Sequence, residues 1–122
     1  MGKKILIADD EPNIVASLEF LMRQKGYVVK LASTGEEALA AVGDFGPDLI
    51  LLDVMMPRMS GYDLCQRLRE NPAWQGIKII MLSAKGRDIE VSKGMAIGAD
   101  AYVTKPFSTK DLIAKVQELL GD

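Results

Sequence analysis

The chain has 122 residues, of which 48% are apolar and 26% are charged, and its formal net charge is −2. This size and composition predict one globular domain with its own hydrophobic core, spanning residues 1–122, and they exclude a broad basic surface for nucleic acid or an anionic membrane. Histidine is absent, which excludes Ser-His-Asp and Cys-His catalysis, and the single cysteine, Cys65, excludes an internal disulfide and fits a reducing compartment.

Short apolar runs alternate with segments of helical periodicity from one end of the chain to the other. In chain order, the pattern predicts a strand at Ile5–Ala8, a helix from Pro12 to Gly26, a strand at Tyr27–Ala32, a helix from Thr34 through Val42, a strand at Leu49–Leu52, a helix that opens at Ser60 and stops before Pro72, a strand at Ile77–Leu82, a helix at Arg87–Ile97, a strand at Ala101–Thr104 and a last helix from Ser108 through Leu120. The hydroxyl residue that opens three of these helices stands three positions before an acid, which is a typical capping signal.

This alternation of strands and helices predicts a parallel sheet that is covered by helices on both faces. For an α/β chain of this length, the flavodoxin-like doubly wound fold is the arrangement that fits, with five parallel strands in the order 2-1-3-4-5 and five helices. In this order the direction of strand addition reverses between strands one and three. The reversal opens a crevice at the carboxyl ends of those strands, where ligands bind in such folds.

Charged and hydroxyl residues stand at the ends of four of the five predicted strands: Asp9-Asp10, Asp53, Ser83 and Lys105. Because the carboxyl ends of parallel strands share one edge of the sheet, we expect these side chains to be neighbours. Three converging carboxylates must share protons or bind a cation, and an all-oxygen site with open positions suits Mg²⁺ beside a phosphate. Lys105 offers a positive charge for a phosphoryl oxygen, and Ser83 offers a hydroxyl donor.

Each of these residues has an ordinary explanation when it is taken alone. Asp9 or Asp10 would suit a helix N-terminus, Asp53 a cap or a turn, Ser83 a turn, and Lys105 the solvated surface. Their joint placement favours a functional site instead. A carboxylate on a rigid buried strand, beside a cation and a lysine, can act as a nucleophile toward a phosphoryl group and form an aspartyl phosphate.

The sequence closely resembles the receiver domain of two-component response regulators over essentially its whole length. The matching segments are Asp9-Asp10, Asp53 with Met56-Pro57 and Gly61, Ser83-Ala84, and the run from Gly98 to Phe107. The resemblance implies a CheY-like signalling domain rather than a turnover enzyme. Such a domain catalyses only its own phosphorylation and slow dephosphorylation.

The resemblance also implies a role for each residue at the phosphorylation site. Asp53 would accept a phosphoryl group from a phosphohistidine on a sensor histidine kinase or a phosphotransfer protein. Asp10, Asp53 and the backbone carbonyl of Met55 would ligate Mg²⁺, for which Mn²⁺ could substitute, and Asp9 would help directly or through water. Lys105 would contact the phosphoryl group. Since Met55 and Lys85, which flank the site, are neither acids nor amides suited to orienting a water, we expect slow self-dephosphorylation.

The same resemblance implies how a signal leaves the site. Ser83 would turn toward the phosphoryl group, Tyr102 would change rotamer in response, and the Lys105–Pro106 peptide bond would be cis. The helix at Arg87–Ile97, the fifth strand and the last helix would form the output face. We expect this face to act on a downstream output domain or protein, or to form a phosphorylation-dependent homodimer. Direct binding of nucleic acid or membrane by this domain is not expected, and the expected location is cytoplasmic.

Three rival classes of function share parts of this pattern. A phosphatase with an aspartate nucleophile resembles an Asp-x-Asp arrangement, but Met55 stands where its second acid would be. A flavin- or nucleotide-binding module would cradle phosphate with glycine or hydroxyl residues after the first strand, where this chain has Asp9-Asp10-Glu11. A pseudo-receiver would have the same fold without phosphorylation, and the complete set of acids with Ser83 and Lys105 argues against it.

Overall fold

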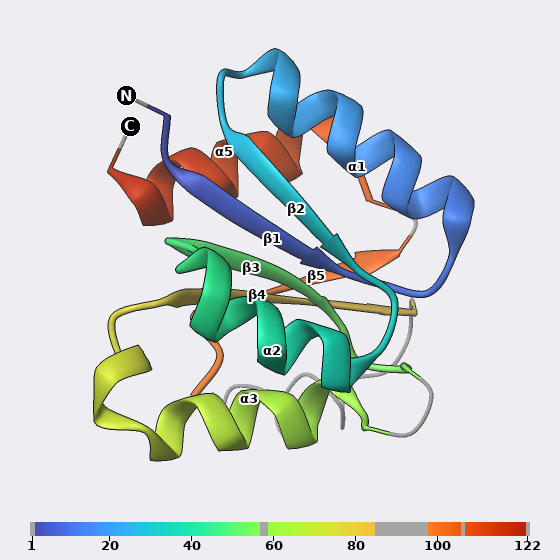
Figure 1. Ribbon diagram of the computed structural model, residues 1–122. Coiled ribbons are helices and arrows are strands. Elements are labelled where there is room, and N and C mark those ends of the chain that lie inside the picture. The colour runs from blue at the N-terminus through green and yellow to red at the C-terminus, as the bar shows by residue number, and fades with distance from the viewer. Residues whose placement is uncertain (1, 57–58, 85–97, 106, 122) are drawn as a thin grey trace.

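The computed structural model describes residues 2–56, 59–84, 98–105 and 107–121, and it shows a five-stranded parallel sheet in the order β2-β1-β3-β4-β5 (Figure 1). The strands are β1 (Lys4–Ala8), β2 (Val28–Ala32), β3 (Leu49–Asp53), β4 (Lys78–Ala84) and β5 (Ala101–Lys105). The described helices are α1 (Pro12–Gln24), α2 (Gly35–Phe45), α3 (Gly61–Glu70) and α5 (Thr109–Leu120), with a 3₁₀ turn, η1, at Pro72–Trp74. The predicted strand order is confirmed, and the predicted helix at Arg87–Ile97 lies outside the described residues.

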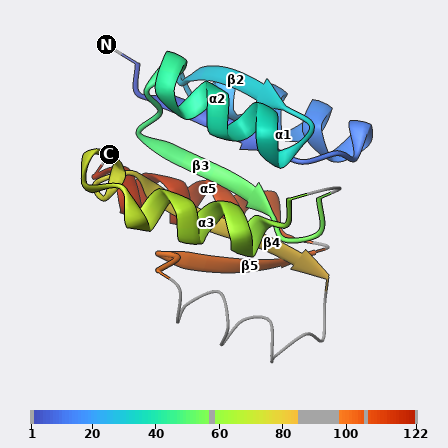
Figure 2. The same cartoon turned by 60° about the horizontal axis from the view of Figure 1, so that its bottom comes forward.

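The sheet is the middle of three layers, with α1 and α5 on one face and α2 and α3 on the other (Figures 1 and 2). Alternate residues of each strand point to opposite faces, so two core clusters form. Ile5, Ile7, Leu49 and Leu51 pack with α1 and α5, whereas Leu6, Ala8, Ile50 and Leu52 pack with α2 and α3. Every residue of β3 is buried, which explains its unbroken apolar run.

Helix starts follow the predicted capping signals. The hydroxyl oxygens of the three N-cap residues Thr34, Ser60 and Ser108 accept hydrogen bonds from backbone N–H groups three residues later, at 3.1, 3.2 and 3.3 Å. Each bond satisfies one of the N–H groups that a helix leaves without an internal partner. At the other end of α2, Gly46 takes a φ of +66°, which favours glycine and ends the helix.

Several predicted boundaries differ from the observed ones by one to three residues, and two of these differences bear on the core and the site. β2 begins at Val28 rather than at Tyr27, whose ring is buried in the core beneath α1. β4 runs from Lys78 to Ala84, two residues beyond the predicted end at Leu82. The extension follows from pairing, because Ser83 and Ala84 lie opposite Thr104 and Lys105 of the neighbouring β5.

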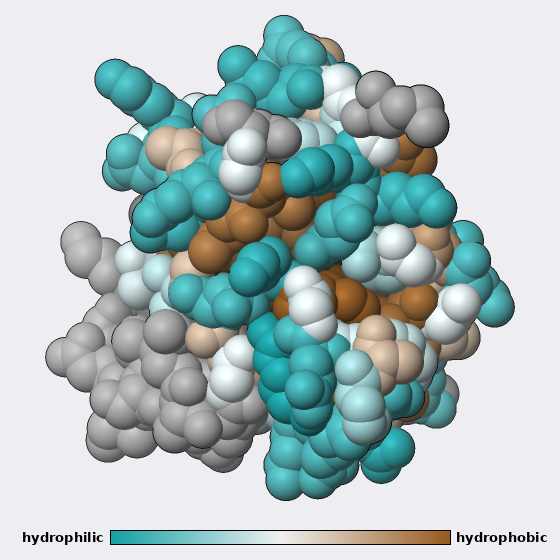
Figure 3. Space-filling model, turned by 90° about the vertical axis from the view of Figure 1, so that its left-hand side faces the viewer, coloured by the Kyte–Doolittle hydropathy of each residue, from teal (hydrophilic) through white to brown (hydrophobic). Residues whose placement is uncertain are grey.

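The face that carries both chain termini shows apolar groups between hydrophilic side chains (Figure 3). A hollow at the amino-terminal ends of the strands is lined by Lys3, Asp48, Gly76, Lys78, Leu119 and Leu120. Asp48 lies here, before the start of β3, with its Oδ2 accepting a hydrogen bond from the backbone N–H of Lys4. Among the described helices, none has the length and apolar character needed to cross a membrane.

Candidate phosphorylation site

Strand register brings the predicted site residues to one edge of the sheet. Ala8 pairs with Leu52, so Asp9 follows β1 at the level where Asp53 ends β3. Asp53 pairs with Leu82, which places Ser83 one residue further along the neighbouring strand. Ala84 pairs with Lys105 at the end of β5. The four strand ends therefore converge as the sequence predicts.

The three acids form a compact group with oxygen ligands only. One carboxylate oxygen of each of Asp9, Asp10 and Asp53 lies within 4.8 Å of the others. Asp9 and Asp53 are buried, whereas Asp10 is exposed. Hard divalent cations that prefer oxygen ligands and retain several waters suit such a half-open set, and Mg²⁺ is the cation that the donor set fits best.

Lys105 reaches into this acidic group from β5. Its Nζ donates a hydrogen bond to Asp9 Oδ2 at 3.0 Å and lies 3.7 Å from Asp53 Oδ1. Burial alone would lower the pKa of Lys105, but the hydrogen bond to Asp9 and the negative charge of Asp53 outweigh burial and raise it. The ammonium group therefore stays charged at neutral pH and offsets part of the negative charge of the site.

Asp53 is held in one orientation, and its surroundings disfavour the negative charge of its carboxylate. Its Oδ1 accepts a hydrogen bond from the backbone N–H of Met55 at 3.0 Å. The pKa of Asp53 is raised to about 6, chiefly by burial and also by the negative charges of Asp9 and Asp10, while the hydrogen bond from Met55 N–H and the charge of Lys105 act in the opposite direction. The carboxylate is thus ionised for the most part at neutral pH. A positive charge that bound beside it would stabilise this ionised form.

Ser83 and Tyr102 lie on neighbouring strands, but neither occupies a turn. Ser83 is buried within β4, so the turn that serine alone would favour is not its position. Tyr102 is half-buried on β5, and its hydroxyl oxygen lies 3.3 Å from the hydroxyl oxygen of Tyr62 on α3. The sequence identifies Tyr62 only as an apolar residue of its helix, because a contact between distant hydroxyls leaves no periodic signal. Pro106 lies outside the described residues, so the cis peptide bond stays a prediction.

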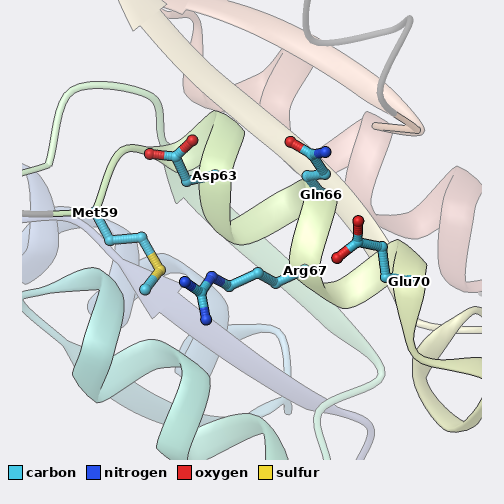
Figure 4. Close-up of a pocket in the computed structure, with 5 residues that line it drawn as sticks. All are labelled: Met59, Asp63, Gln66, Arg67 and Glu70. Carbon is cyan, nitrogen blue, oxygen red and sulfur yellow. The ribbon is translucent and has the colours of Figure 1, made fainter.

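A separate hollow lies along the solvent-exposed side of α3 (Figure 4). It is lined by Met59, Asp63, Gln66, Arg67 and Glu70. The side chains of Met59 and Arg67 extend toward each other, while Asp63 and Glu70 bring negative charge. This mixture of charges lacks the converging carboxylates and the lysine of the strand-end group, so the hollow is not the predicted site.

Comparison with known proteins identifies the family. A family model for the response regulator receiver domain matches residues 5–117. This chain belongs to the receiver domain family. The alkaline phosphatase synthesis transcriptional regulatory protein PhoP of Bacillus subtilis is 43% identical over 120 residues, which are 98% of this receiver and 49% of PhoP. The DNA-binding response regulator MtrA of Mycolicibacterium smegmatis is 41% identical over 98% of this receiver and 51% of MtrA. The receiver thus spans about half the length of these relatives.

Solved structures give the same answer for the fold. A putative response regulator from Chloroflexus aurantiacus is similar to this receiver with a TM-score of 0.96 and 35% identity, covering 100% of both chains. The receiver domain of a sensor histidine kinase from Pseudomonas aeruginosa has a TM-score of 0.90 and 27% identity, again over 100% of both chains. That receiver domain was solved with a magnesium ion coordinated in its active-site cleft.

Proposed function

We propose that this domain is a phospho-accepting receiver in which Asp53 takes a phosphoryl group from a phosphohistidine on a sensor histidine kinase or a phosphotransfer protein. The observation that carries the proposal is the setting of Asp53. Its buried carboxylate ends a rigid central strand, lies 3.7 Å from the ammonium group of Lys105 and shares a compact cluster with Asp9 and Asp10. Membership of the receiver family supports this assignment.

The chemistry needs one nucleophile and several charges that do not move. A carboxylate oxygen of Asp53 attacks the phosphorus atom, the P–N bond breaks, and the imidazole leaves with its electron pair and takes a proton from solvent. Lys105, whose Nζ lies 3.7 Å from Asp53 Oδ1, would contact the oxygens of the transferred group, which carry the negative charge. The hydrogen bond from Met55 N–H to Asp53 Oδ1 keeps the carboxylate in one orientation during the attack.

The acids would hold the metal that such a transfer requires. We assign Asp10, Asp53 and the backbone carbonyl of Met55 as ligands of Mg²⁺ or Mn²⁺, with Asp9 acting directly or through water. When bound, the cation supplies positive charge that offsets the carboxylates and the phosphoryl oxygens. The fit rests on three carboxylate oxygens lying within 4.8 Å of one another, with one of the acids open to solvent.

The added phosphate would change the surface beyond the site. It brings about two negative charges and three strong acceptors, to which the hydroxyl of Ser83 turns while Tyr102 changes rotamer. The output face would comprise the segment 87–97, β5 and α5. Backbone hydrogen exchange tests this arrangement in the protein with and without beryllofluoride, a phosphoryl mimic. Protection should change across residues 84–108, and unchanged protection there contradicts the switch.

Mass spectrometry tests the phosphorylation itself. After treatment with acetyl phosphate and Mg²⁺, the protein should gain the mass of one phosphate, and Asp53→Asn should abolish the gain. Asp48→Asn is the matched control, because Asp48 lies at the opposite edge of the sheet, on the backbone N–H of Lys4. The control should gain phosphate as the natural protein does. A natural protein that gains no phosphate would instead be a pseudo-receiver.

The role in signalling follows from the same reaction. The relatives include regulators described as transcriptional and DNA-binding, and this chain matches about half of each. We propose that the receiver controls an output domain or protein through the output face, with no nucleic-acid contact of its own. Size-exclusion chromatography with light scattering tests the phosphorylation-dependent homodimer. The apparent mass should double only when beryllofluoride and Mg²⁺ are both present.

A further inference from the structure

The first residue of α3 is in direct contact with the main chain of the phosphorylation site. The backbone N–H of Gly61 donates a hydrogen bond to the carbonyl oxygen of Val54 at 3.1 Å. A Cβ atom at Gly61 would lie only 2.4 Å from the carbonyl oxygen of Asp53. The helix therefore begins against the end of β3, closer than any side chain would allow, and a shift of the Asp53 backbone must move the first turn of α3.

Tyr62 comes next in the chain and extends this contact across the core. Its ring is buried with Leu52 and Val54 in the cluster between the sheet and the helices α2 and α3. Its hydroxyl oxygen reaches the hydroxyl oxygen of Tyr102 on β5 at 3.3 Å. Tyr27, the third tyrosine of the chain, belongs to the core cluster on the opposite face of the sheet. The two hydroxyls thus join α3 to the edge strand β5.

We propose that Tyr62 is a positioning residue for Tyr102: the contact between the two hydroxyls holds the Tyr102 ring in its present orientation and ties that orientation to the Asp53 end of β3 through Gly61. This inference rests on the proposed function only where it concerns the response to phosphate. The orienting effect itself is a property of the phosphate-free chain. One neutral hydrogen bond changes a two-state ratio by roughly two- to tenfold, which is enough to bias a half-buried ring.

The geometry indicates why a tyrosine suits this position. A half-buried ring such as Tyr102 can direct its hydroxyl inward to a protein acceptor or outward to water. The buried neighbour offers one partner that is fixed in place, because Tyr62 lies in the first turn of a helix anchored on Val54. Phenylalanine at residue 62 would fill the same space in the core but would offer the Tyr102 hydroxyl no partner.

Fluorine NMR of protein labelled with 3-fluorotyrosine tests the proposal, since only three tyrosines report. Tyrosine-to-phenylalanine variants assign the three signals. In phosphate-free Tyr62→Phe, the Tyr102 signal should move and show a larger H₂O-to-D₂O solvent shift, while the Tyr27 signal should stay. Tyr27→Phe is the control, because it removes the hydroxyl of a buried tyrosine in the other core cluster, and it should leave the Tyr102 signal in place.

Two outcomes overturn the proposal: a Tyr102 signal that is the same in Tyr62→Phe and in the natural protein, or a signal that moves equally in both phenylalanine variants. Addition of beryllofluoride and Mg²⁺ then tests the coupling. The Tyr102 signal of Tyr62→Phe should move two- to tenfold less than that of the natural protein, and an equal displacement refutes the tie to Asp53. Failure of the natural protein to take phosphate from acetyl phosphate contradicts the proposed function alone, because the phosphate-free comparison stands without it.

Discussion

Arg69 should be the most important charged side chain for stability among the described residues, because it contacts four residues and joins the end of α3 to two other segments. Its Nε donates to the carbonyl oxygen of Gly98 at 2.8 Å, and its Nη1 donates to the carbonyls of Ile77 and Gln75 at 2.8 and 3.2 Å. Its Nη2 contacts Asp100 Oδ2 at 2.7 Å. The end of α3 is thereby fixed to the starts of β4 and β5.

The expected cost of Arg69→Met can be worked from these contacts. Methionine keeps an apolar stem, but three carbonyl oxygens lose the guanidinium donor, and the Asp100 carboxylate loses it too while keeping the hydrogen bond from the backbone N–H of Ile79. The side chains of Arg69 and Asp100 are 18% and 28% exposed, so water repairs part of the loss. Hydrogen bonds to charged groups contribute about 1.5–3 kcal/mol each and do not add fully, so we expect the free energy of unfolding to fall by about 2–4 kcal/mol.

Urea denaturation followed by circular dichroism measures this change, with the slope of the transition checking that unfolding stays two-state. Arg23→Met is the matched control. Arg23 pairs with Glu19 at 3.0 Å on the surface of α1, where the two side chains are 54% and 32% exposed, and it donates one hydrogen bond to the Val29 carbonyl at 3.2 Å, so its loss should cost only about 1 kcal/mol. Equal losses in the two variants would refute the reasoning, because the number of partly buried acceptors would then not decide the cost. Phosphorylation of Arg69→Met should persist, since Arg69 lies at the opposite edge of the sheet.

Three further outcomes follow from the site. In metal-free buffer, Asp53→Asn should raise the free energy of unfolding at pH 8 by about 1–3 kcal/mol, because the folded state holds the Asp53 proton more tightly than the unfolded chain does. Denaturant titrations at several pH values should show this gain shrinking to nothing as the pH falls from about 6 toward 4. Gly61→Ala should lower the free energy of unfolding by about 1–3 kcal/mol, because its Cβ meets the Asp53 carbonyl, whereas Gly43→Ala, in open space on α2, should raise it by about 0.5–1 kcal/mol. Phosphorylated protein freed of acetyl phosphate should lose its label over minutes or longer, as Met55 cannot orient water, and a half-life of seconds in mass spectrometry would contradict this.

The sheet and the acidic group could be predicted because both depend on local pattern and one geometric rule. Apolar runs such as Leu49–Leu52 identify strands, and parallel strands necessarily bring their carboxyl ends to one edge. Together with the strand order, that rule brings Asp9, Asp53 and Lys105 to one side of the sheet, and the structure shows the Lys105 Nζ at 3.0 Å from Asp9 and 3.7 Å from Asp53. The extension of β4 through Ser83 escaped prediction because it depends on pairing with β5, which no single segment reveals.

The contacts that could not be predicted are those between side chains and distant main chain. Arg69 has no periodic signal for its three carbonyl partners, and Asp100 is recognisable only as part of a family motif. The hydroxyl pair of Tyr62 and Tyr102 joins residues that are 40 positions apart, and it depends on ring orientations that are set by the whole core. Such contacts follow from the folded backbone and do not contribute to the patterns from which it is predicted.

The two ends of the parallel strands differ in how well their charges are matched. This contrast explains where the structure can respond to phosphate. At the starting edge of β4 and β5, Asp100 Oδ2 accepts from both Arg69 and the backbone N–H of Ile79, so its charge is matched. At the other edge, burial and two neighbouring acids raise the pKa of Asp53 to about 6, and Lys105 is the described cation that approaches it. Positive charge that binds there relieves repulsion already present in the folded chain. Because the matched edge has no such repulsion to relieve, a structural response to phosphate should begin beside Asp53 and end before it reaches Arg69.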